Sequence, residues 1–260
     1  MIGKELTHDT SLSKIERVYI RFFGAPINGL RIRARRILPL IPEGCTNILD
    51  SGCGQGVFTF EVARRFPDSE VTGMDMNGDL IERNRRIAGR IGLTNCRFEE
   101  GDITEILGKK GYDLILSIDV LEHVEDDDRV LNSYMRALGD NSELLLHVPG
   151  YYRRWPVFGW KENFEVEGHY RHGYTMEDIT AKVTGAGFEI TDSYYTYGWI
   201  ETMSNNLSYA ITGAQMKRKY LYALAFPFLL GFSYFGKDSR PSRGAGILIR
   251  AKKRDSDDTV

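Results

Sequence analysis

The stretch ILDSGCGQGVFTFEVA, residues 48–63, decides the fold. A short apolar strand ends at Asp50, and Gly52, Gly54 and Gly56 then lead into a helical pattern. Glycine lets the backbone turn sharply and approach a ligand without a Cβ atom in the way. Because doubly wound sheets bind their ligands at the carboxyl ends of strands, this turn is predicted to hold one.

The chain around this stretch alternates short apolar strands with helical patterns. Such alternation specifies a parallel sheet with helices on both faces. The expected strands cover 47–50, 71–75, 96–102, 112–119, 143–149, 188–197 and 244–253. The expected helices between them cover 57–66, 78–91, 127–138 and 176–185.

Composition excludes several classes of protein. The chain has 260 residues, of which 42% are hydrophobic and 27% charged, values that rule out a disordered or fibrous chain. A net charge of −2 gives no whole-protein argument for binding nucleic acid, and DNA is not expected as a partner. Three scattered cysteines indicate a reducing compartment. Since no secretory signal is visible either, we expect a cytoplasmic protein.

Four parts are expected along the chain. Residues 1–44 form a helical arm, 45–199 the ligand-binding core, 200–243 an apolar helical insertion, and 244–260 the last strand and a tail. In the arm, one helical face is apolar and carries Leu12, Ile15, Val18, Tyr19, Phe22 and Phe23. A second, basic helix of the arm is expected to turn its arginines mostly outward, namely Arg31, Arg33, Arg35 and Arg36.

Two further carboxylates follow strands of the predicted sheet. Asp75 ends the second strand, where an acidic side chain accepts hydrogen bonds from ribose hydroxyls of an adenosine moiety. Asp102 follows the third strand, where it can accept a hydrogen bond from the adenine amino group while Ile103 packs on the ring. The alternative is a surface turn aspartate for Asp75 and a helix cap or turn residue for Asp102.

A nicotinamide dinucleotide competes for the same architecture. Its fingerprint is G-x-G-x-x-G, but the sixth position here is Val57, and Asp50 precedes the run. The Asp50 carboxylate would repel a pyrophosphate and favours a ligand with sulfonium and ammonium groups.

As a set, Asp50–Gly56, Asp75, Asp102 and YDLILSIDVLEHVED (112–126) resemble the class I S-adenosylmethionine-dependent methyltransferases. The similarity is to the small-molecule branch with an L-E-H-V segment. It implies an α/β, doubly wound, seven-stranded and mostly parallel sheet of Rossmann-like type. The last strand would be antiparallel, between the fifth and the sixth. Ser51 and Gln55 are small departures from the family pattern.

The resemblance implies S-adenosylmethionine as the cofactor. Backbone around Gly52 and Gly54 would hold its methionine part, and Asp119 would lie by the sulfur. The complete cofactor-binding set expected on this basis is Asp50, Ser51, Gly52, Gly54, Asp75, Met76, Asp102, Ile103, Asp119 and Val120.

The acceptor side of the site is expected around histidines. A hydroxyl acceptor must lose its proton, and histidine is the natural base near neutral pH. His123 lies in the L-E-H-V segment, and His169, Arg171 and His172 lie in GHYRHGYT, before the helix at 176. A purely structural role is the alternative for each of these four predicted catalytic residues. His147, inside the fifth strand, is expected to face the core.

The same segment also has a spacing that occurs in metal sites. Asp119, Glu122 and His123 have D-x-x-E-H spacing. Some quinone-ring and small-RNA methyltransferases hold a divalent metal with a similar E-x-x-E-H set. Since many relatives carry L-E-H-V without a metal, no metal is expected here.

The apolar run YLYALAFPFLLGFSYF, residues 220–235, raises the question of a membrane. It is shorter than the about 20 residues that a span needs and contains Pro227. It is expected either to roof the active site or form a homodimer contact, or to lie in a membrane interface between Arg218, Lys219 and Lys237.

These features together predict a methyltransferase of a small, lipophilic or glycan-like acceptor, with transfer to oxygen. Peripheral contact with the inner face of the membrane and a homodimer are expected with it. The aromatic loop 150–174 would border the acceptor. Methylation of RNA or protein, and cofactor binding without catalysis, are the alternatives.

Overall fold

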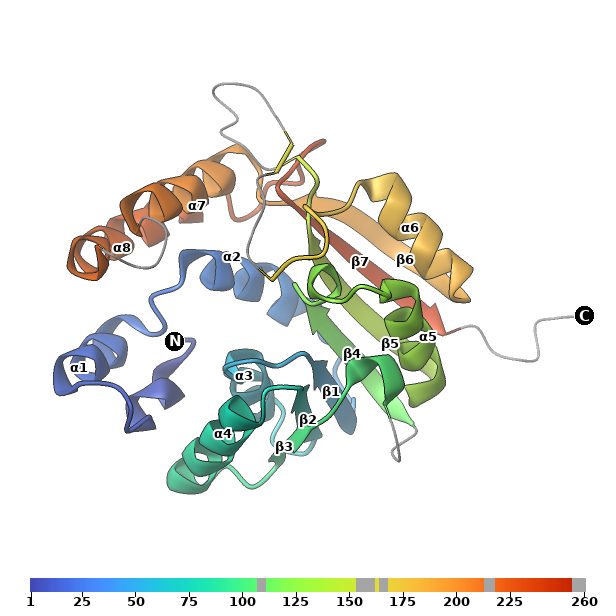
Figure 1. Ribbon diagram of the computed structural model, residues 1–260, viewed down its shortest axis with the longest axis horizontal. Coiled ribbons are helices and arrows are strands. Elements are labelled where there is room, and N and C mark those ends of the chain that lie inside the picture. The colour runs from blue at the N-terminus through green and yellow to red at the C-terminus, as the bar shows by residue number, and fades with distance from the viewer. Residues whose placement is uncertain (107–110, 153–161, 164–167, 213–217, 254–260) are drawn as a thin grey trace, which may run out of the picture.

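The computed structural model describes residues 1–106, 111–152, 162–163, 168–212 and 218–253 (Figure 1). Its strands form one seven-stranded sheet. They are β1 (Asn47–Ser51), β2 (Glu70–Asp75), β3 (Cys96–Glu100), β4 (Tyr112–Ile118), β5 (Leu138–Pro149), β6 (Phe188–Thr196) and β7 (Gly246–Lys253). Parts of the expected aromatic loop, 153–161 and 164–167, lie outside the described residues.

The strand order is β3-β2-β1-β4-β5-β7-β6. The first five strands of this sheet pair in parallel, whereas β7 runs antiparallel to both β5 and β6. This confirms the expected topology. The carboxyl ends of β1, β2 and β4 therefore meet at one edge of the sheet, and the segments that follow them lie side by side there.

The described residues also form eight α-helices. They are α1 (Lys14–Phe23), α2 (Asn28–Ile37), α3 (Val57–Arg65), α4 (Gly78–Ile91), α5 (Asp127–Ala137), α6 (Met176–Gly185), α7 (Trp199–Thr212) and α8 (Lys219–Tyr234). Neighbouring strand residues point to opposite faces. Ile48 accordingly joins a core formed with α2, α3 and α4, while Leu49 joins a second core formed with α5 and α6.

The arginines of α2 do not face solvent, so the expectation of an outward basic face is wrong. Arg36 is buried, and its guanidinium bonds both carboxylate oxygens of the buried Glu201 in α7. Arg35 donates to the same carboxylate at 2.7 Å and to the Ser233 carbonyl at 3.1 Å. The arm is therefore joined to the insertion by a buried ionic network. The periodicity of α2 did not reveal it, because the partner lies far along the chain.

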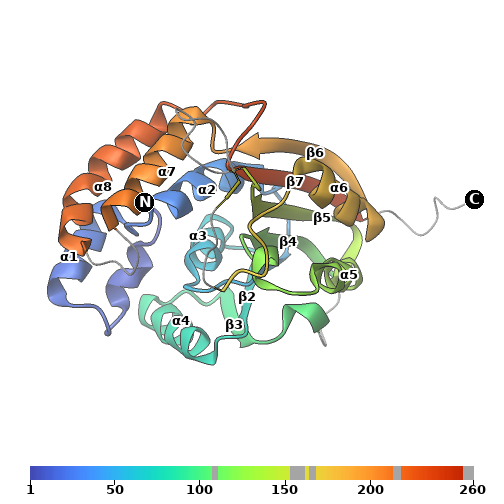
Figure 2. The same cartoon turned by 45° about the horizontal axis from the view of Figure 1, so that its top comes forward.

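α1 differs from expectation in the opposite sense. Its apolar face is only partly covered, since Ile15, Val18 and Phe22 are exposed. Tyr19, on the same helix, donates from its hydroxyl to the Ala223 carbonyl of α8 at 2.6 Å. α1 and α8 thus lie side by side, as Figure 2 also shows.

α7 and α8 make up the insertion. The buried Ser204 hydroxyl of α7 donates to the Leu229 carbonyl of α8 at 2.6 Å. Pro227 lacks the N–H that would bond the Ala223 carbonyl, and this carbonyl accepts the Tyr19 hydroxyl instead. Among the described helices, none combines the length and the apolar character needed to cross a bilayer.

Candidate active site

The turn after β1 has the predicted geometry. Gly52 and Gly54 have φ angles of 69° and 49°, the left-handed region that favours glycine. The backbone N–H of Gly54 donates to Asp75 Oδ2 at 2.8 Å, and that of Asn77 donates to Asp75 Oδ1 at 2.9 Å. The carboxylate that ends β2 therefore lies against the glycine turn.

The corner after β4 touches the same turn. A Cβ atom added to Gly52 would lie only 2.6 Å from Val120 Cγ2. Val120 is buried, and Asp119 before it has a φ of 54°, which is uncommon for a residue with a side chain. The structure thus brings together the two segments predicted to hold the methionine end and the sulfur.

Asp50 and Ser51 lie deeper than the turn. The buried Asp50 carboxylate accepts a hydrogen bond from Thr59 Oγ1 at 2.6 Å, and burial raises the pKa of Asp50 to about 7. The Ser51 hydroxyl is fully buried against the Tyr134 hydroxyl at 2.8 Å. Only the backbone of Ser51 borders the turn.

At the predicted adenine end, Asp102 and Ile103 lie after β3. Asp102 is exposed and accepts a hydrogen bond from the N–H of Thr104 at 2.8 Å. It therefore caps a short helical turn, which is the alternative role considered for this residue. Ile103 is buried, and Met76 is 68% exposed after β2. A carboxylate has further lone pairs, so the cap leaves Asp102 able to accept another bond.

A buried polar chain runs behind Asp119. Its Oδ1 lies 2.6 Å from His147 Nδ1, and His147 Nε2 lies 2.8 Å from Thr196 Oγ1. Since a carboxylate only accepts, we infer that Nδ1 carries the proton and that Nε2 accepts from the Thr196 hydroxyl. His147 is buried in β5, as expected, but it is a hydrogen-bonded residue behind the site rather than a packing residue.

Arg33 of α2 closes this chain from the other side. Its guanidinium lies 2.8 Å from Asp119 Oδ2 and donates to the Tyr197 hydroxyl at 3.2 Å. Burial by itself lowers the pKa of Arg33, but the Asp119 carboxylate together with the Tyr197 and Tyr209 hydroxyls outweighs it, and the pKa is raised above the ordinary value. The N-terminal arm therefore contributes a charged side chain to the edge of the predicted cofactor site.

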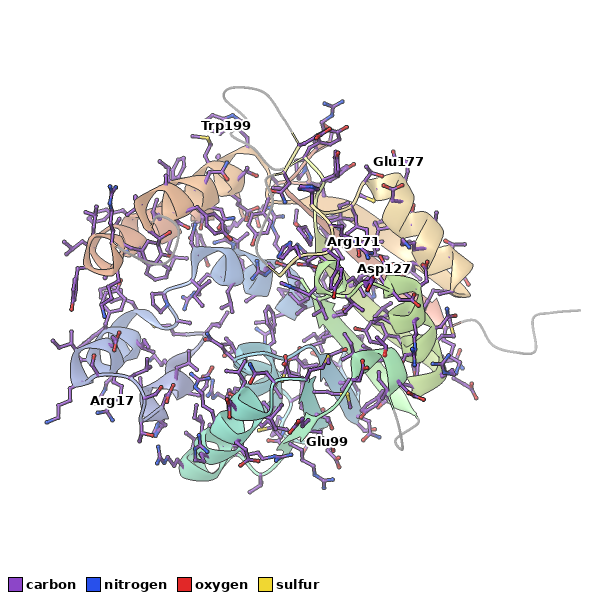
Figure 3. All side chains as sticks on the ribbon, viewed as in Figure 1. Arg17, Glu99, Asp127, Arg171, Glu177 and Trp199 are labelled. Carbon is purple, nitrogen blue, oxygen red and sulfur yellow. The ribbon has the colours of Figure 1, made fainter. Side chains whose placement is uncertain are left out.

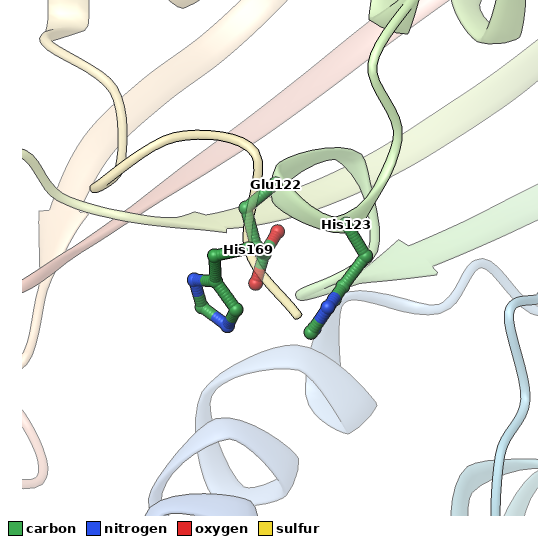
Figure 4. Close-up of side chains that lie close together, drawn as sticks. All are labelled: Glu122, His123 and His169. Atoms are coloured by element: carbon green, nitrogen blue, oxygen red, sulfur yellow. The ribbon is translucent and has the colours of Figure 1, made fainter. Parts of the chain in front are cut away.

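Three side chains meet where the acceptor was expected (Figure 4). Glu122 and His123 come from the turn after β4, and His169 comes from the segment before α6. The two imidazole rings are 4.4 Å apart in an edge-on arrangement. His123 Nδ1 lies 2.9 Å from the Gly168 carbonyl. Because a carbonyl only accepts, Nδ1 carries the proton, and Nε2 of a neutral ring keeps its lone pair.

Arg171 and His172 have different surroundings. Arg171 pairs with the buried Asp127 of α5 and donates to the carbonyls of Val124 and Glu125 at 2.9 and 2.7 Å (Figure 3). It therefore fixes the segment that carries His169 onto the start of α5. His172 is exposed.

The side chains that could bind a metal together differ from the set that the sequence spacing suggested, Asp119, Glu122 and His123. Asp119 faces Arg33 and His147, whereas ligand atoms of Glu122, His123 and His169 lie within 4.8 Å of one another. One carboxylate and two imidazoles suit a transition metal better than magnesium. These three residues are the group of the described chain that can hold a metal ion.

Sequence reasoning missed three residues around the site. Arg33 and Thr196 complete the polar chain through Asp119, and Asp127 anchors Arg171. These partners are 44 to 86 positions away, so no local pattern marks them.

A family model described as a methyltransferase domain matches residues 43–191, and the chain belongs to this family. The chain therefore contains a class I S-adenosylmethionine-dependent methyltransferase domain, the family whose cofactor is S-adenosylmethionine.

Curated relatives agree with this assignment. A trans-aconitate 2-methyltransferase of Deinococcus radiodurans is 36% identical over 117 residues, which cover 45% of this chain and 43% of the relative. A malonyl-[acyl-carrier protein] O-methyltransferase of Ilyobacter polytropus is 24% identical over 144 residues, with 55% and 53% covered. The matches span about half the length of these relatives.

Solved structures share the fold. An O-methyltransferase from a trans-AT PKS multienzyme of Brevibacillus brevis, in complex with S-adenosyl-L-homocysteine, has a TM-score of 0.59 at 13% identity, covering 97% of this chain and 80% of that one. A SAM-dependent methyltransferase from Archaeoglobus fulgidus has a TM-score of 0.58 at 17% identity, covering 93% and 100%.

Proposed function

We propose that this methyltransferase transfers the methyl group to an oxygen atom of a small acceptor, with His123 as the general base. The observation that carries this proposal is the hydrogen bond of His123 Nδ1 to the Gly168 carbonyl, which leaves Nε2 able to take a proton. A hydroxyl acceptor must lose its proton as the new C–O bond forms, and a neutral imidazole serves this purpose.

The other side chains of the acceptor region have supporting roles in this proposal. His169 contacts the acceptor beside His123, and His172 lies at the outer end of the same segment. Arg171 acts as a positioning residue, because its guanidinium is held by Asp127 and by two carbonyls. Together they place the acceptor in line with the sulfonium, and positioning supplies much of the rate of such a displacement.

The cofactor roles follow the sequence assignment. Asp75 binds the ribose, Asp102 and Ile103 the adenine, and the backbone at Gly52 and Gly54 the methionine part. The buried Asp50 carboxylate attracts the ammonium group, and binding of this cation opposes the effect of burial on the pKa of Asp50. The remaining members of the set, Ser51, Met76, Asp119 and Val120, line the pocket through backbone or apolar contact.

The acceptor is proposed to have an apolar body, as in a lipid or a lipid-linked glycan. The enzyme would act in the cytoplasm as a monomer or homodimer, in peripheral contact with the inner face of the membrane, where such acceptors are concentrated. Exposed apolar side chains on α1 and α8 support this placement. In this proposal residues 45–199 form the catalytic core, while 1–44 and 200–243 form one cap joined through Glu201.

A transfer experiment tests the proposal. The protein is incubated with methyl-tritiated S-adenosylmethionine and an extract of its host, and the product is partitioned between organic solvent and water. Counts in the organic phase that vanish with Asp75→Ala, and fall at least about 100-fold with His123→Ala, are expected. Counts confined to water would contradict a lipid-like acceptor, and counts in precipitated material would indicate RNA or protein. Unchanged turnover in His123→Ala would remove the base.

A further inference from the structure

α8 carries apolar side chains on its outer face as well as its inner one. Tyr222, Phe226 and Leu229 are buried against the rest of the fold. On the outer face, side chains three, four or seven positions apart share a stripe. That stripe is exposed and consists of Leu221, Leu224, Phe228 and Phe235. Phe228 and Phe235 are 79% and 83% exposed, and the run 220–235 contains no charged residue.

α1 adds a second stripe beside it. Ile15, Val18 and Phe22 are exposed at spacings of three and four, and Ile15 is 76% exposed. The two helices are held together by the hydrogen bond from Tyr19 to the Ala223 carbonyl and by an ion pair between Lys219 and Glu16 at 3.7 Å. Figures 1 and 2 both place α1 and α8 at the same side of the molecule, away from α5 and α6.

Basic side chains surround these stripes. Lys14, Arg17 and Arg21 lie on α1, and none of them has a carboxylate partner among the residues that the structure describes. Arg218 and Lys219 begin α8 and are exposed. Lys14, Arg17 and Arg21 also line a hollow next to α1, to which Lys4 adds one more positive charge, whereas Arg64 in the same hollow is paired with Glu5 and Glu61.

We propose that α1 and α8 form one docking face for a bilayer that contains anionic lipids. The aliphatic and aromatic side chains of the two stripes enter the interface, and the lysines and arginines contact the phosphate groups. This arrangement has the apolar face and basic rim of an interfacial helix. A second copy of the chain would bring the same positive charges against each other, which opposes a dimer through this face.

The face is fixed to the active site. Arg35 and Arg36 of α2 hold the end of α8 and Glu201, while Arg33 of the same helix contacts Asp119. A docked α1–α8 face therefore has a defined position relative to the predicted cofactor pocket. The inference deepens the proposed membrane location, but it does not depend on methyl transfer or on the identity of the acceptor.

Vesicle sedimentation tests the docking face with the full chain. Vesicles of phosphatidylcholine with phosphatidylglycerol are expected to bind it, and binding is expected to weaken with salt. Phe228→Ser should weaken binding at least about tenfold, because one buried phenylalanine is worth that much. Arg17→Glu combined with Arg21→Glu should weaken it about 30-fold or more.

Matched variants lie elsewhere on the surface. Tyr152→Ser replaces an aromatic residue that is 48% exposed after β5, and Arg136→Glu reverses a charge on α5. Both are expected to bind vesicles as the parent does, and circular dichroism checks that every variant is folded. No binding to the anionic vesicles, or equal binding by Phe228→Ser and Tyr152→Ser, would overturn the proposal. A dimer in solution that Phe228→Ser dissociates, without vesicle binding, would assign the face to a second copy instead.

Discussion

The contact between Gly52 and Val120 makes a steric prediction about the glycine turn. In Gly52→Ala the new Cβ atom would lie 2.6 and 2.7 Å from the two Val120 methyl carbons, distances that force something to move. Overpacking of this kind costs about 1–3 kcal/mol. The left-handed φ of 69° adds about 1–2 kcal/mol for any residue with a Cβ atom. The expected loss of unfolding free energy is therefore about 2–5 kcal/mol.

Gly54→Ala is the matched control for this substitution. Gly54 also has a left-handed φ, but nothing lies within 4 Å of an added Cβ atom. Only the backbone cost of about 1–2 kcal/mol is expected. In a Val120→Ala background the two methyl carbons are gone and only the Cβ atom of residue 120 remains, 3.3 Å from the added atom, so Gly52→Ala should cost little more than Gly54→Ala does. The double-mutant cycle should thus show a coupling of about 1–3 kcal/mol.

Urea unfolding measures these free energies, and calorimetric titration with S-adenosylhomocysteine measures affinity. The added methyl of Gly54→Ala points into the open space proposed for the methionine part, so affinity should fall at least about tenfold while the protein stays folded. Equal destabilisation by the two alanine variants, or a coupling near zero, would refute the steric account. Unchanged affinity in Gly54→Ala would place the cofactor elsewhere.

Three further predictions concern charge and metal. Burial raises the pKa of Asp50 to about 7, so the folded state binds the Asp50 proton more tightly than the unfolded state does, and the free energy of unfolding should fall as pH rises from about 4 to about 7. Asp50→Asn should flatten this part of the plot of unfolding free energy against pH, and an unaltered plot would contradict the prediction. Glu201→Ala leaves Arg35 and Arg36 buried without their carboxylate, and urea unfolding should show a loss of about 3–5 kcal/mol, whereas a loss below about 1 kcal/mol would argue against the ionic network. Turnover should be unchanged by EDTA in metal-free buffer, and a loss that Mn²⁺ restores would reassign Glu122 and its two histidine neighbours as a metal centre.

Much of the fold was predictable because its signals are local. The strand ending at Asp50, the glycines after it and the helical spacing of 127–138 are all read within one window of sequence. The helix expected at 176–185 has the bounds of α6. β5 is the main difference, since it begins at Leu138 instead of 143. Gly139 to Ser142 carry no apolar signal, Asn141 has a left-handed φ of 57°, and the pairing with β4 shifts register at this point.

The rest of the site depends on contacts between distant segments. The direction of Arg33, Arg35 and Arg36 is set by Asp119 and Glu201, which no helical periodicity can reveal. His169 likewise lies beside His123 because Arg171, two positions after His169, is anchored to Asp127 of a distant segment. The residue types around the acceptor were therefore predictable, whereas their grouping was not.

The pairing of Arg36 with Glu201, 165 positions apart, has a consequence for biosynthesis. At the usual pace of translation, roughly 10 to 30 seconds pass between the appearance of the two residues at the ribosome. During that time α2 has no ionic partner, and β5 still lacks β7, which is made last and fills the place between β5 and β6. The nascent chain therefore emerges with its arm undocked and the edge of β5 open. A chaperone that shields apolar segments should matter more for the yield of this protein than for its stability once complete.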